Sequence, residues 1–520
     1  MNSVHVLAAP EIHAPPVEFS QLAPMLIVLG TATVGVLVEA FVARASRYAV
    51  QFPLALAGLA VGFGWTLWLG FSVKPFHAAA AGAVAVDGPT LFIQGTILVL
   101  AMLSLLLIAE RAHGAFTAQA AALPGSEAEQ ESMAGGGIQT EIFPLTLFAV
   151  GGMMLFPAAN DLLTMFVALE VLSLPLYLLC GMARRRRLLS QEAAMKYFLL
   201  GAFSSAFFLF GVAMLYGYSG SVKLAAIATA ASGNTQSAAL LYAGIALLGV
   251  GLLFKIGAVP FQAWKPDVYQ GAPTPVTALM ASCTLVSAFG AVLRVFYVAF
   301  GQLTWDWRPM MWGVAILTML GGSIIAITQT DVKRLLAYSS IAQAGYILTG
   351  VVAATTAGLS SSMFYLAAYG FATVGAFAVV TLIRDASGEA GHLSRWAGLG
   401  KRSPLVAGVF AFFLIAFAGI PLTSGFTGKF AVFQAAIAGG ALPLVIVGVI
   451  SSAILAFPYV RVIVLMFFSE PAFDGPAVVK PSAYTSVAVG IGVLATLVLG
   501  VVPEPLLRLA HDAATTLFVR

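Results

Sequence analysis

The chain is dominated by runs of about 20 apolar residues, the length that an α-helix needs to cross the hydrocarbon core of a bilayer. Hydrophobic residues make up 60 % of the 520 residues and charged residues only 9 %, whereas soluble domains carry about 25 % charged residues. We therefore expect an all-α polytopic membrane protein with about 14 transmembrane helices. The fourteen runs lie at roughly 22–43, 52–72, 90–109, 142–158, 160–182, 196–218, 238–261, 273–300, 310–329, 335–356, 360–383, 404–437, 440–468 and 484–503.

Lysine and arginine in the loops predict which side faces the cytoplasm, because cytoplasmic loops are enriched in these residues. Loops after even-numbered runs contain few of them. Loops after odd-numbered runs contain Arg44, Arg47, Arg111, Arg184 to Arg187, Lys265, Lys333, Arg334, Arg384, Arg395, Lys401, Arg402 and Lys480. The odd-side loops are thus expected in the cytoplasm and both termini outside it. The polar, small-residue stretch 113–140 is expected to be a flexible cytoplasmic linker.

Among the ionisable residues inside the apolar runs, three stand out: Glu170, Lys255 and Lys429. A charged side chain at the centre of a bilayer costs roughly 2.5–3.5 kcal/mol on insertion scales, so such residues are rare and usually functional. The sequence contains no Gly-rich phosphate loop, no GxSxG elbow and no HExxH pattern, so soluble-enzyme chemistry is not supported. All six histidines fall outside the runs. These residues predict an ion or proton path built from lysine, glutamate and water.

Lys255 is the centre of this prediction. Burial disfavours the charged form of a lysine and a nearby carboxylate favours it, so a movable partner would switch Lys255 between holding and releasing a proton. Glu170 is the expected partner; the alternative is a static ion pair that fixes helix packing. Lys196, at the start of the sixth run, is either a relay between the halves of the path or an interface lysine. Lys429 follows a Gly-rich break, where its alternative role is to cap freed carbonyl groups.

Two segments suggest an internal repeat. LLFKIGAVPFQAW at 252–264 and IAFAGIPLTSGFTGKFAVF at 415–433 each combine one lysine with a proline inside an apolar run. Pro421, Gly425 and Gly428 are expected to break the long run at 404–437. The segments lie five runs apart, so they cross the membrane in opposite directions. Taking Lys255 and Lys429 as counterparts, we expect an inverted repeat with broken helices, as in many transporters.

Several phrases resemble a known family. LEVLSLPLYLL, EAAMKYFLLGAFSSAFFLFG, LLFKIGAVPFQAWKPDVYQGAPTPVTA, DVKRLLAYSSIAQAGYILTG and GIPLTSGFTGKFAVF are similar to the antiporter-like N subunits of bacterial respiratory complex I, the NADH:quinone oxidoreductase, whose mitochondrial counterpart is NADH dehydrogenase subunit 2. The similarity covers roughly the fourth to the thirteenth run. Mrp-type cation/proton antiporters and membrane-bound hydrogenases share only the looser LxxxGxPxxxGFxxK pattern.

The resemblance implies fourteen helices with two inverted five-helix repeats, and a function. The expected regions are an N-terminal three-helix region with linker (1–141), the two antiporter-like repeats (142–300 and 301–469), and a C-terminal span with a tail (470–520). The subunit would couple quinone reduction to proton translocation across the bacterial plasma (inner) membrane. The residues implied on the proton path are Glu170, Lys196, Lys255 and Lys429.

The same resemblance implies the partners. This chain would hold no cofactor, and NADH, FMN, iron–sulfur clusters and quinone would belong to other subunits. Its neighbours would be the antiporter-like subunit M, the small K- and J-type subunits and the lipid bilayer, with no nucleic acid.

Two positions depart from the family pattern. The usual motif VPFHxWTPD reads VPFQAWKPD here, with Gln262 in place of histidine and Lys265 in place of threonine. The family also has a lysine in the eighth span where this chain has Leu285, which cannot relay a proton. Either water or Lys265 takes over its role, or the chain is a non-pumping scaffold paralogue. A subunit of a multisubunit cation/proton antiporter is the remaining alternative.

Overall fold

The computed structural model describes residues 17–72, 77–111, 115–116, 127, 139–183, 187–233, 237–385, 388–471 and 475–517. Most of the predicted linker at 113–140 and the arginines at 184–186 lie outside these residues. The expectations for them therefore stay predictions.

The N-terminal region consists of three long helices and a small hairpin. Pro53 lies inside the second helix, and the third begins with an Asp87 side chain that accepts a hydrogen bond from the Thr90 amide, the usual way to satisfy a free N-terminal donor. The elements are α1 (Phe19–Phe41), α2 (Arg44–Ser72), β1 (His77–Ala79), β2 (Val84–Val86) and α3 (Gly88–Ile108).

The next stretch of chain contains the first broken span. Its last helix, α12, is bracketed by two π-helical turns, η1 and η2. The elements are α5 (Ile142–Ala158), α6 (Leu162–Cys180), α7 (Arg187–Ser219), α8 (Leu224–Gly233), α9 (Ala238–Ile256), α10 (Trp264–Gly271), α11 (Thr274–Leu279), η1 (Met280–Thr284), α12 (Leu285–Arg294) and η2 (Val295–Ala299).

The remaining chain contains the second broken span and ends in two helices. The elements are α13 (Thr304–Ile327), α14 (Val332–Val352), α15 (Thr356–Leu382), β3 (Ile383–Asp385), β4 (Gly388–Glu389), η3 (Leu393–Trp396), α16 (Leu399–Arg402), α17 (Pro404–Ala418), α18 (Ser424–Ala438), α19 (Leu442–Phe468), β5 (Ala477–Val478), α20 (Ala483–Val501) and α21 (Glu504–Ala514).

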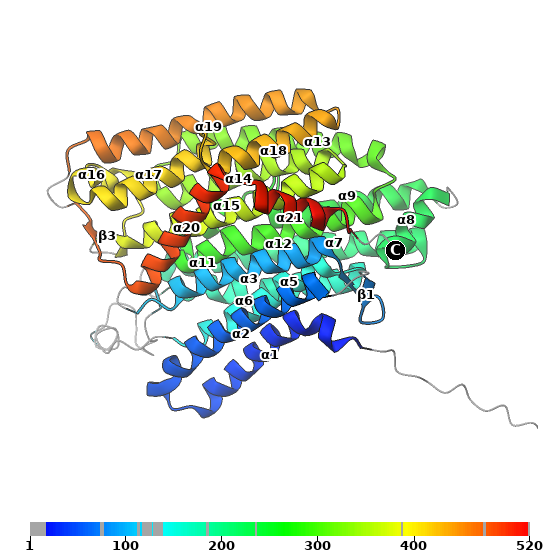
Figure 1. Ribbon diagram of the computed structural model, residues 1–520, viewed down its shortest axis with the longest axis horizontal. Coiled ribbons are helices and arrows are strands. Elements are labelled where there is room, and N and C mark those ends of the chain that lie inside the picture. Colours follow the sequence, from blue (N-terminus) through cyan, green and yellow to red (C-terminus); the bar gives the residue numbers. More distant parts are fainter. Residues whose placement is uncertain are drawn as a thin grey trace, which may run out of the picture.

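The long helices run side by side, with the hairpin β1–β2 at one end of the bundle and β3 at the other (Figure 1). Among the described residues, twelve helices are long and apolar enough to cross a membrane. The all-α polytopic class is therefore confirmed. The count of fourteen is reached only if the 17-residue α5 and the α17–α18 pair are added, so it stays a prediction.

The helix breaks differ from the expected positions in two ways. The seventh span ends its helix at Ile256, before Pro260, instead of continuing to 261. In the twelfth span the break covers 419–423 and includes Pro421, but Gly425 and Gly428 lie inside α18. These two glycines allow close packing: a Cβ would lie 1.9 Å from the Ala416 carbonyl oxygen at Gly425 and 2.4 Å from the Tyr365 ring at Gly428.

The expected C-terminal tail is also largely helical. Its helix, α21, continues from α20 toward the end of the bundle that holds β1 (Figure 1), and it packs against α15 and α3. A Cβ on Gly88, the first residue of α3, would lie 2.5 Å from the Ala513 carbonyl oxygen. The tail is therefore packed against the bundle.

Candidate functional site

Lys255 lies in the last turn of α9, where the seventh span breaks. The helix ends because Gly257 adopts the left-handed conformation, with φ of 73°, which glycine tolerates without strain. The Lys255 side chain is buried, and its Nζ donates a hydrogen bond of 2.6 Å to Oγ of Ser173 on α6. A charged group thus lies in the core of the bundle, next to an interrupted helix.

Glu170, the expected partner of Lys255, lies near it without a direct ion pair, so this partnership stays a prediction. Among the described residues, no ion pair joins Glu170 to Lys255, and Oε1 of Glu170 is buried without a hydrogen-bond partner. Glu170 lies one helical turn before Ser173 on α6, so both side chains face the same neighbours. Lys255 therefore donates its hydrogen bond to the Ser173 hydroxyl, and the Glu170 carboxylate lies beside this hydrogen bond.

Two tyrosines complete the surroundings of Lys255. Its Nζ lies 5.8 Å from the ring centroid of Tyr177 and 5.6 Å from that of Tyr197, distances at which a cation is attracted to an aromatic face. The two rings meet edge to face at 4.7 Å, and Tyr197 stacks on Trp264 of α10 at 4.8 Å. Both tyrosine hydroxyls are buried without a partner, so they provide polar groups that can exchange protons beside Lys255.

Neither tyrosine was predicted from the sequence, although a signal was present. Glu170, Ser173 and Tyr177 follow one another at the i, i+3 and i+7 positions of α6, a spacing that places side chains on one face of a helix. Tyr197 directly follows Lys196 on α7. The polar face of an otherwise apolar run was therefore readable from periodicity.

Lys196 lies at the surface of the bundle, with 40 % of its side chain exposed. Its Nζ forms ion pairs of 2.7 Å with Glu192 and with Asp267 of α10. Asp267 also pairs with Arg334 of α14. The structure thus brings Lys196 together with the segment that follows the first break, and it ties α7, α10 and α14 to one another.

Lys429 lies on α18, beyond the second break. Its buried Nζ donates hydrogen bonds to the carbonyl oxygens of Phe417 and Ala418, at 3.0 and 2.9 Å, and to Oγ of Ser452 at 2.8 Å. The ring centroid of Tyr346 lies 4.7 Å away. Lys429 therefore caps carbonyl groups freed by the break, as the alternative for this residue expected.

A polar connection runs from Lys429 toward the centre of the molecule. Gln343 on α14 donates a 2.9 Å hydrogen bond to the same Phe417 carbonyl oxygen, and it accepts one from the Tyr365 hydroxyl. Gln343, Tyr365, Tyr369 and Phe417 line a small cavity between α14, α15 and α17. Polar side chains thus reach from the second break to the interface of α14 and α15.

The position of Leu285 contains no substitute for a lysine. Leu285 is buried at the start of α12. The only charged residue on that span is Arg294, whose guanidinium forms two 2.7 Å hydrogen bonds with the carboxylate of Asp87 and also contacts Thr90. Arg294 thus serves packing, and the span contains no Lys, His, Asp or Glu that could take the place of a lysine at 285.

The other charges near the spans also have structural partners. Arg461 donates to the carbonyl oxygens of Ile327 and Gln329, both at 2.7 Å. Glu39 pairs with Arg47 and Gln51. Across the described residues, no group of three or more His, Cys, Asp or Glu is arranged to hold a metal ion.

Comparison with known proteins identifies the family. The family model "NADH:quinone oxidoreductase/Mrp antiporter, TM" matches residues 159–455. Subunit N of the NADH-quinone oxidoreductase of Rhodococcus opacus is 64 % identical over 526 residues, with 97 % of each chain covered. The subunit N of Mycobacterium tuberculosis is 56 % identical over 527 residues, covering 97 % of this chain and 99 % of the relative. The chain belongs to the subunit N family of NADH-quinone oxidoreductase.

Solved structures agree with this family. A chain of respiratory complex I from Thermus thermophilus with bound aureothin has a TM-score of 0.76 and 32 % identity, covering 94 % of this chain and 99 % of its own. A chain of the Mrp complex from a Dietzia species has a TM-score of 0.79 but 23 % identity, so it shares the fold alone. The subunit N assignment is thus favoured over the Mrp-type alternative.

A subunit N is an antiporter-like, proton-translocating subunit in the membrane arm of this complex. The oxidoreductase activity belongs to the complex as a whole.

Proposed function

We propose that Lys255 is the residue at which this subunit N takes up and releases a proton. The observation that carries the proposal is its buried ammonium group, which is bound to the Ser173 hydroxyl and lies beside the unpartnered Glu170 carboxylate. A carboxylate that approaches Lys255 favours the protonated form, and one that withdraws favours release. Proton transfer then follows from small movements of Glu170 relative to Lys255.

Lys196 and Lys429 are proposed as the two ends of the path. Lys196 is exposed at the surface and paired with Asp267, which supports exchange with a neighbouring subunit. Lys429, which the family resemblance assigns to the outward half, lies at the second break and shares the Phe417 carbonyl with Gln343. Protons would pass from the Lys255 region to Lys429 and leave on the outer side.

The neighbours are proposed to be the antiporter-like subunit M and the small K- and J-type subunits, with NADH, FMN, iron–sulfur clusters and quinone held elsewhere in the complex. Ile420 and Leu422 in the second break are exposed. Irregular backbone at membrane depth is tolerated only where it faces protein or water, which supports a covering neighbour at this position.

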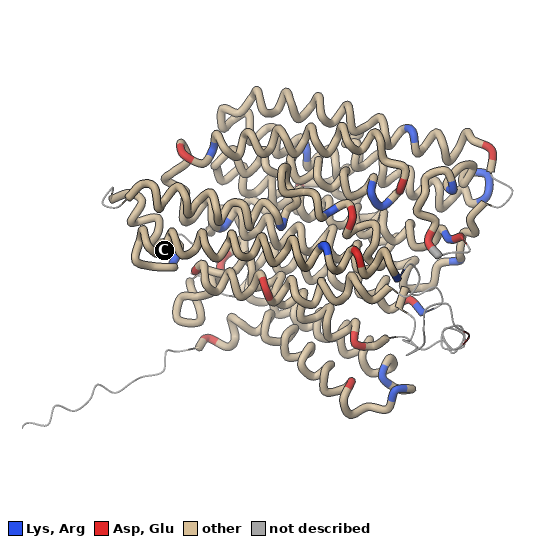
Figure 2. The backbone as a smooth tube through the Cα atoms, turned by 180° about the vertical axis from the view of Figure 1, so that it is seen from behind, with Lys and Arg blue, Asp and Glu red and all other residues tan. Residues whose placement is uncertain are grey.

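The orientation is proposed from the distribution of charge. Figure 2 shows that the described Lys and Arg residues gather mainly toward one end of the bundle, the end that holds β3 in Figure 1. Cytoplasmic loops are enriched in these residues. This end would face the cytoplasm of the bacterial inner membrane, and both termini would lie on the other side.

Replacing Glu170 by glutamine should slow NADH-driven proton uptake in inverted vesicles while leaving the amount of assembled complex unchanged on a native gel. The amide keeps the shape of the side chain but removes the charge that tunes Lys255. The matched control is Glu504→Gln, which alters an exposed pair with Arg508 and should pump normally. Wild-type uptake in Glu170→Gln would contradict a role for this carboxylate.

A further inference from the structure

Lys265 is a second buried lysine beside the first break, and its position was not predicted. The sequence placed it in a cytoplasmic loop, but it lies on the short helix α10 and is only 1 % exposed. Its Nζ donates a 3.1 Å hydrogen bond to the carbonyl oxygen of Ile256, the last residue of α9, and lies 5.7 Å from the ring centroid of Tyr269. Helix α10 thus folds back and directs a lysine to the end of α9.

The same arrangement exists at the second break. Gly257 and Gly419 both end their helices in the left-handed conformation, with φ of 73° and 82°. In each case a lysine of the following helix returns to a carbonyl just before that glycine. A Cβ on the glycine would lie 2.7 Å from Cδ of Lys265 and 2.9 Å from Cδ of Lys429. Lys265 is therefore the counterpart of Lys429.

This correspondence corrects the expected pairing of Lys255 with Lys429. A two-fold rotation inverts the direction of a segment in the membrane but preserves the order of residues along the chain. A lysine after the break in one repeat must therefore match a lysine after the break in the other. Lys255, which precedes its break, has Phe417 at the equivalent position two residues before the glycine.

The charge of Lys265 has little compensation. A lysine ammonium has three donors, and the structure gives Lys265 one hydrogen bond, to a main-chain oxygen. Among the described residues, no carboxylate forms an ion pair with it. Burial of an unpaired charge is costly, and such a group tends to become neutral instead. Lys265 is thus suited to change its protonation state.

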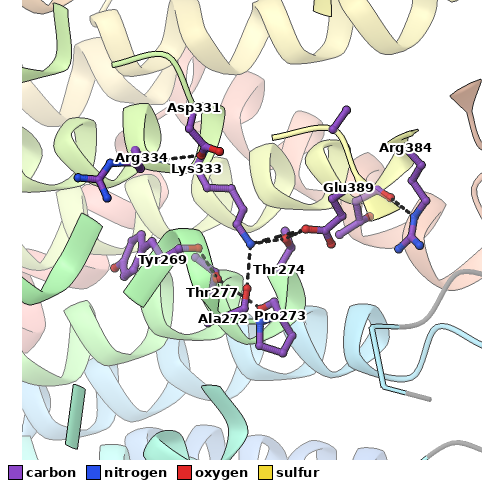
Figure 3. Close-up of polar contacts among 12 residues, drawn as sticks. Tyr269, Ala272, Pro273, Thr274, Thr277, Asp331, Lys333, Arg334, Arg384 and Glu389 are labelled. Atoms are coloured by element: carbon purple, nitrogen blue, oxygen red, sulfur yellow. Dashed lines mark hydrogen bonds and ion pairs between the residues drawn. The ribbon is translucent and has the colours of Figure 1, made fainter. Parts of the chain in front are cut away.

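Lys333 provides the contrast within the same region. It is also buried and donates to a main-chain oxygen, that of Ala272, at 2.8 Å. Unlike Lys265, it has a carboxylate partner, Glu389, at 3.6 Å, and it also contacts Thr274 (Figure 3). This cluster holds the chain that follows α10 in place, so Lys333 is a fixed structural charge.

Polar groups continue from Lys265 toward the second break. Tyr269 lies beside Lys265 on α10, and the Ser340 hydroxyl lies next to the phenolic groups of Tyr269 and Tyr369. Tyr369 lines the same cavity as Gln343 and Tyr365, which lead to Lys429 through Phe417. This route does not include Leu285.

We propose that Lys265 is the residue that passes protons from the Lys255 region to Lys429 in this chain, in the role that the family gives to a lysine at position 285. In this step an N–H bond of the Lys265 ammonium breaks, hydroxyl groups carry the proton to the cavity lined by Tyr365 and Tyr369, water entering that cavity passes it on, and an N–H bond forms on neutral Lys429. No electron is transferred and the net charge is unchanged. The proposal rests on the proposed function of the subunit.

The test uses Lys265→Arg in the whole complex. Arginine can still donate to the Ile256 carbonyl, so it preserves a purely structural cap, but it does not deprotonate in proteins. NADH-driven proton uptake in inverted vesicles should fall at least about tenfold at equal assembly, because a positioned proton-transfer group commonly contributes a hundredfold or more. The matched control Lys333→Arg should keep its pumping.

The outcomes separate the two proposals. Normal pumping in Lys265→Arg together with failure of Lys255→Arg would overturn the role of Lys265 and leave the proposed function intact. Normal pumping in both variants would overturn both. If Lys265→Arg does not assemble, Lys265→Thr decides instead: it should lose pumping, and adding Leu285→Lys should restore it. Failure of that second change to restore any uptake would also overturn the role of Lys265.

Discussion

Replacing Lys255 by arginine should abolish NADH-driven proton uptake through this subunit, even though the positive charge is kept. Arginine does not release its proton at any accessible pH, so it keeps a positive charge beside Ser173, Tyr177 and Tyr197 but cannot carry a proton. Loss of a positioned proton-transfer group predicts a decrease on the order of a hundredfold in the transfer step. Proton uptake in inverted vesicles measures it.

This experiment has two controls: the amount of assembled complex and the neutral variant Lys255→Ala. A native gel should show wild-type amounts of complex for Lys255→Arg and Lys255→Ala, and both should fail to pump. If the arginine variant pumps while alanine does not, Lys255 is a fixed charge. If both pump normally, this chain is a scaffold within the membrane arm.

Replacing Asp87 by asparagine should lower the stability of the subunit by about 3–5 kcal/mol, since removing one partner of a buried ion pair leaves the other charge uncompensated. Arg294 and Asp87 are both buried and joined by two hydrogen bonds. Asparagine has nearly the same shape and can still accept the hydrogen bond from the Thr90 amide. The assembled complex should therefore dissociate at a clearly lower temperature on native gels.

Two comparisons show whether the charge is responsible. Removing the exposed pair with Arg508→Met should change stability by less than about 1 kcal/mol, as is typical of surface ion pairs. The double variant Asp87→Asn with Arg294→Leu should recover part of the loss, because it removes the unpaired charge. Equal stability of Asp87→Asn and wild type would show that the pair contributes no net stability.

The sequence predicts the membrane class and the two spans that are broken, because both follow from local properties. Long apolar runs require helices in a bilayer, and Pro260 and Pro421 lack the amide hydrogen that a continuous helix needs. The role of Gly425 and Gly428, in contrast, could not be predicted from the local sequence. Their role is contact with Ala416 and Tyr365, and such contacts depend on how helices distant in sequence pack together.

The sequence predicts the charged residues of the site but not the residues that contact them. Glu170, Lys196, Lys255 and Lys429 were all identified because charges stand out in apolar runs, and their roles stay predictions. Lys265 was misplaced because WKPDVYQG resembles a polar loop. It is buried because α10 packs against α7 and α14, and no property of the eight residues by themselves indicates that packing.

The two π-helical turns beside α12 change the direction in which the side chains of this span face. A wide turn acts as a one-residue insertion in a helix, and each residue of an α-helix advances the side chains by about 100°. The side chains beyond η1 therefore face a different direction from the one predicted by counting residues from Thr274 along a regular α-helix. Arg294 lies beyond η1, so its contact with Asp87 is made with this extra rotation in place. Deleting one residue of η1 would yield a more regular helix but turn the arginine away from its acid.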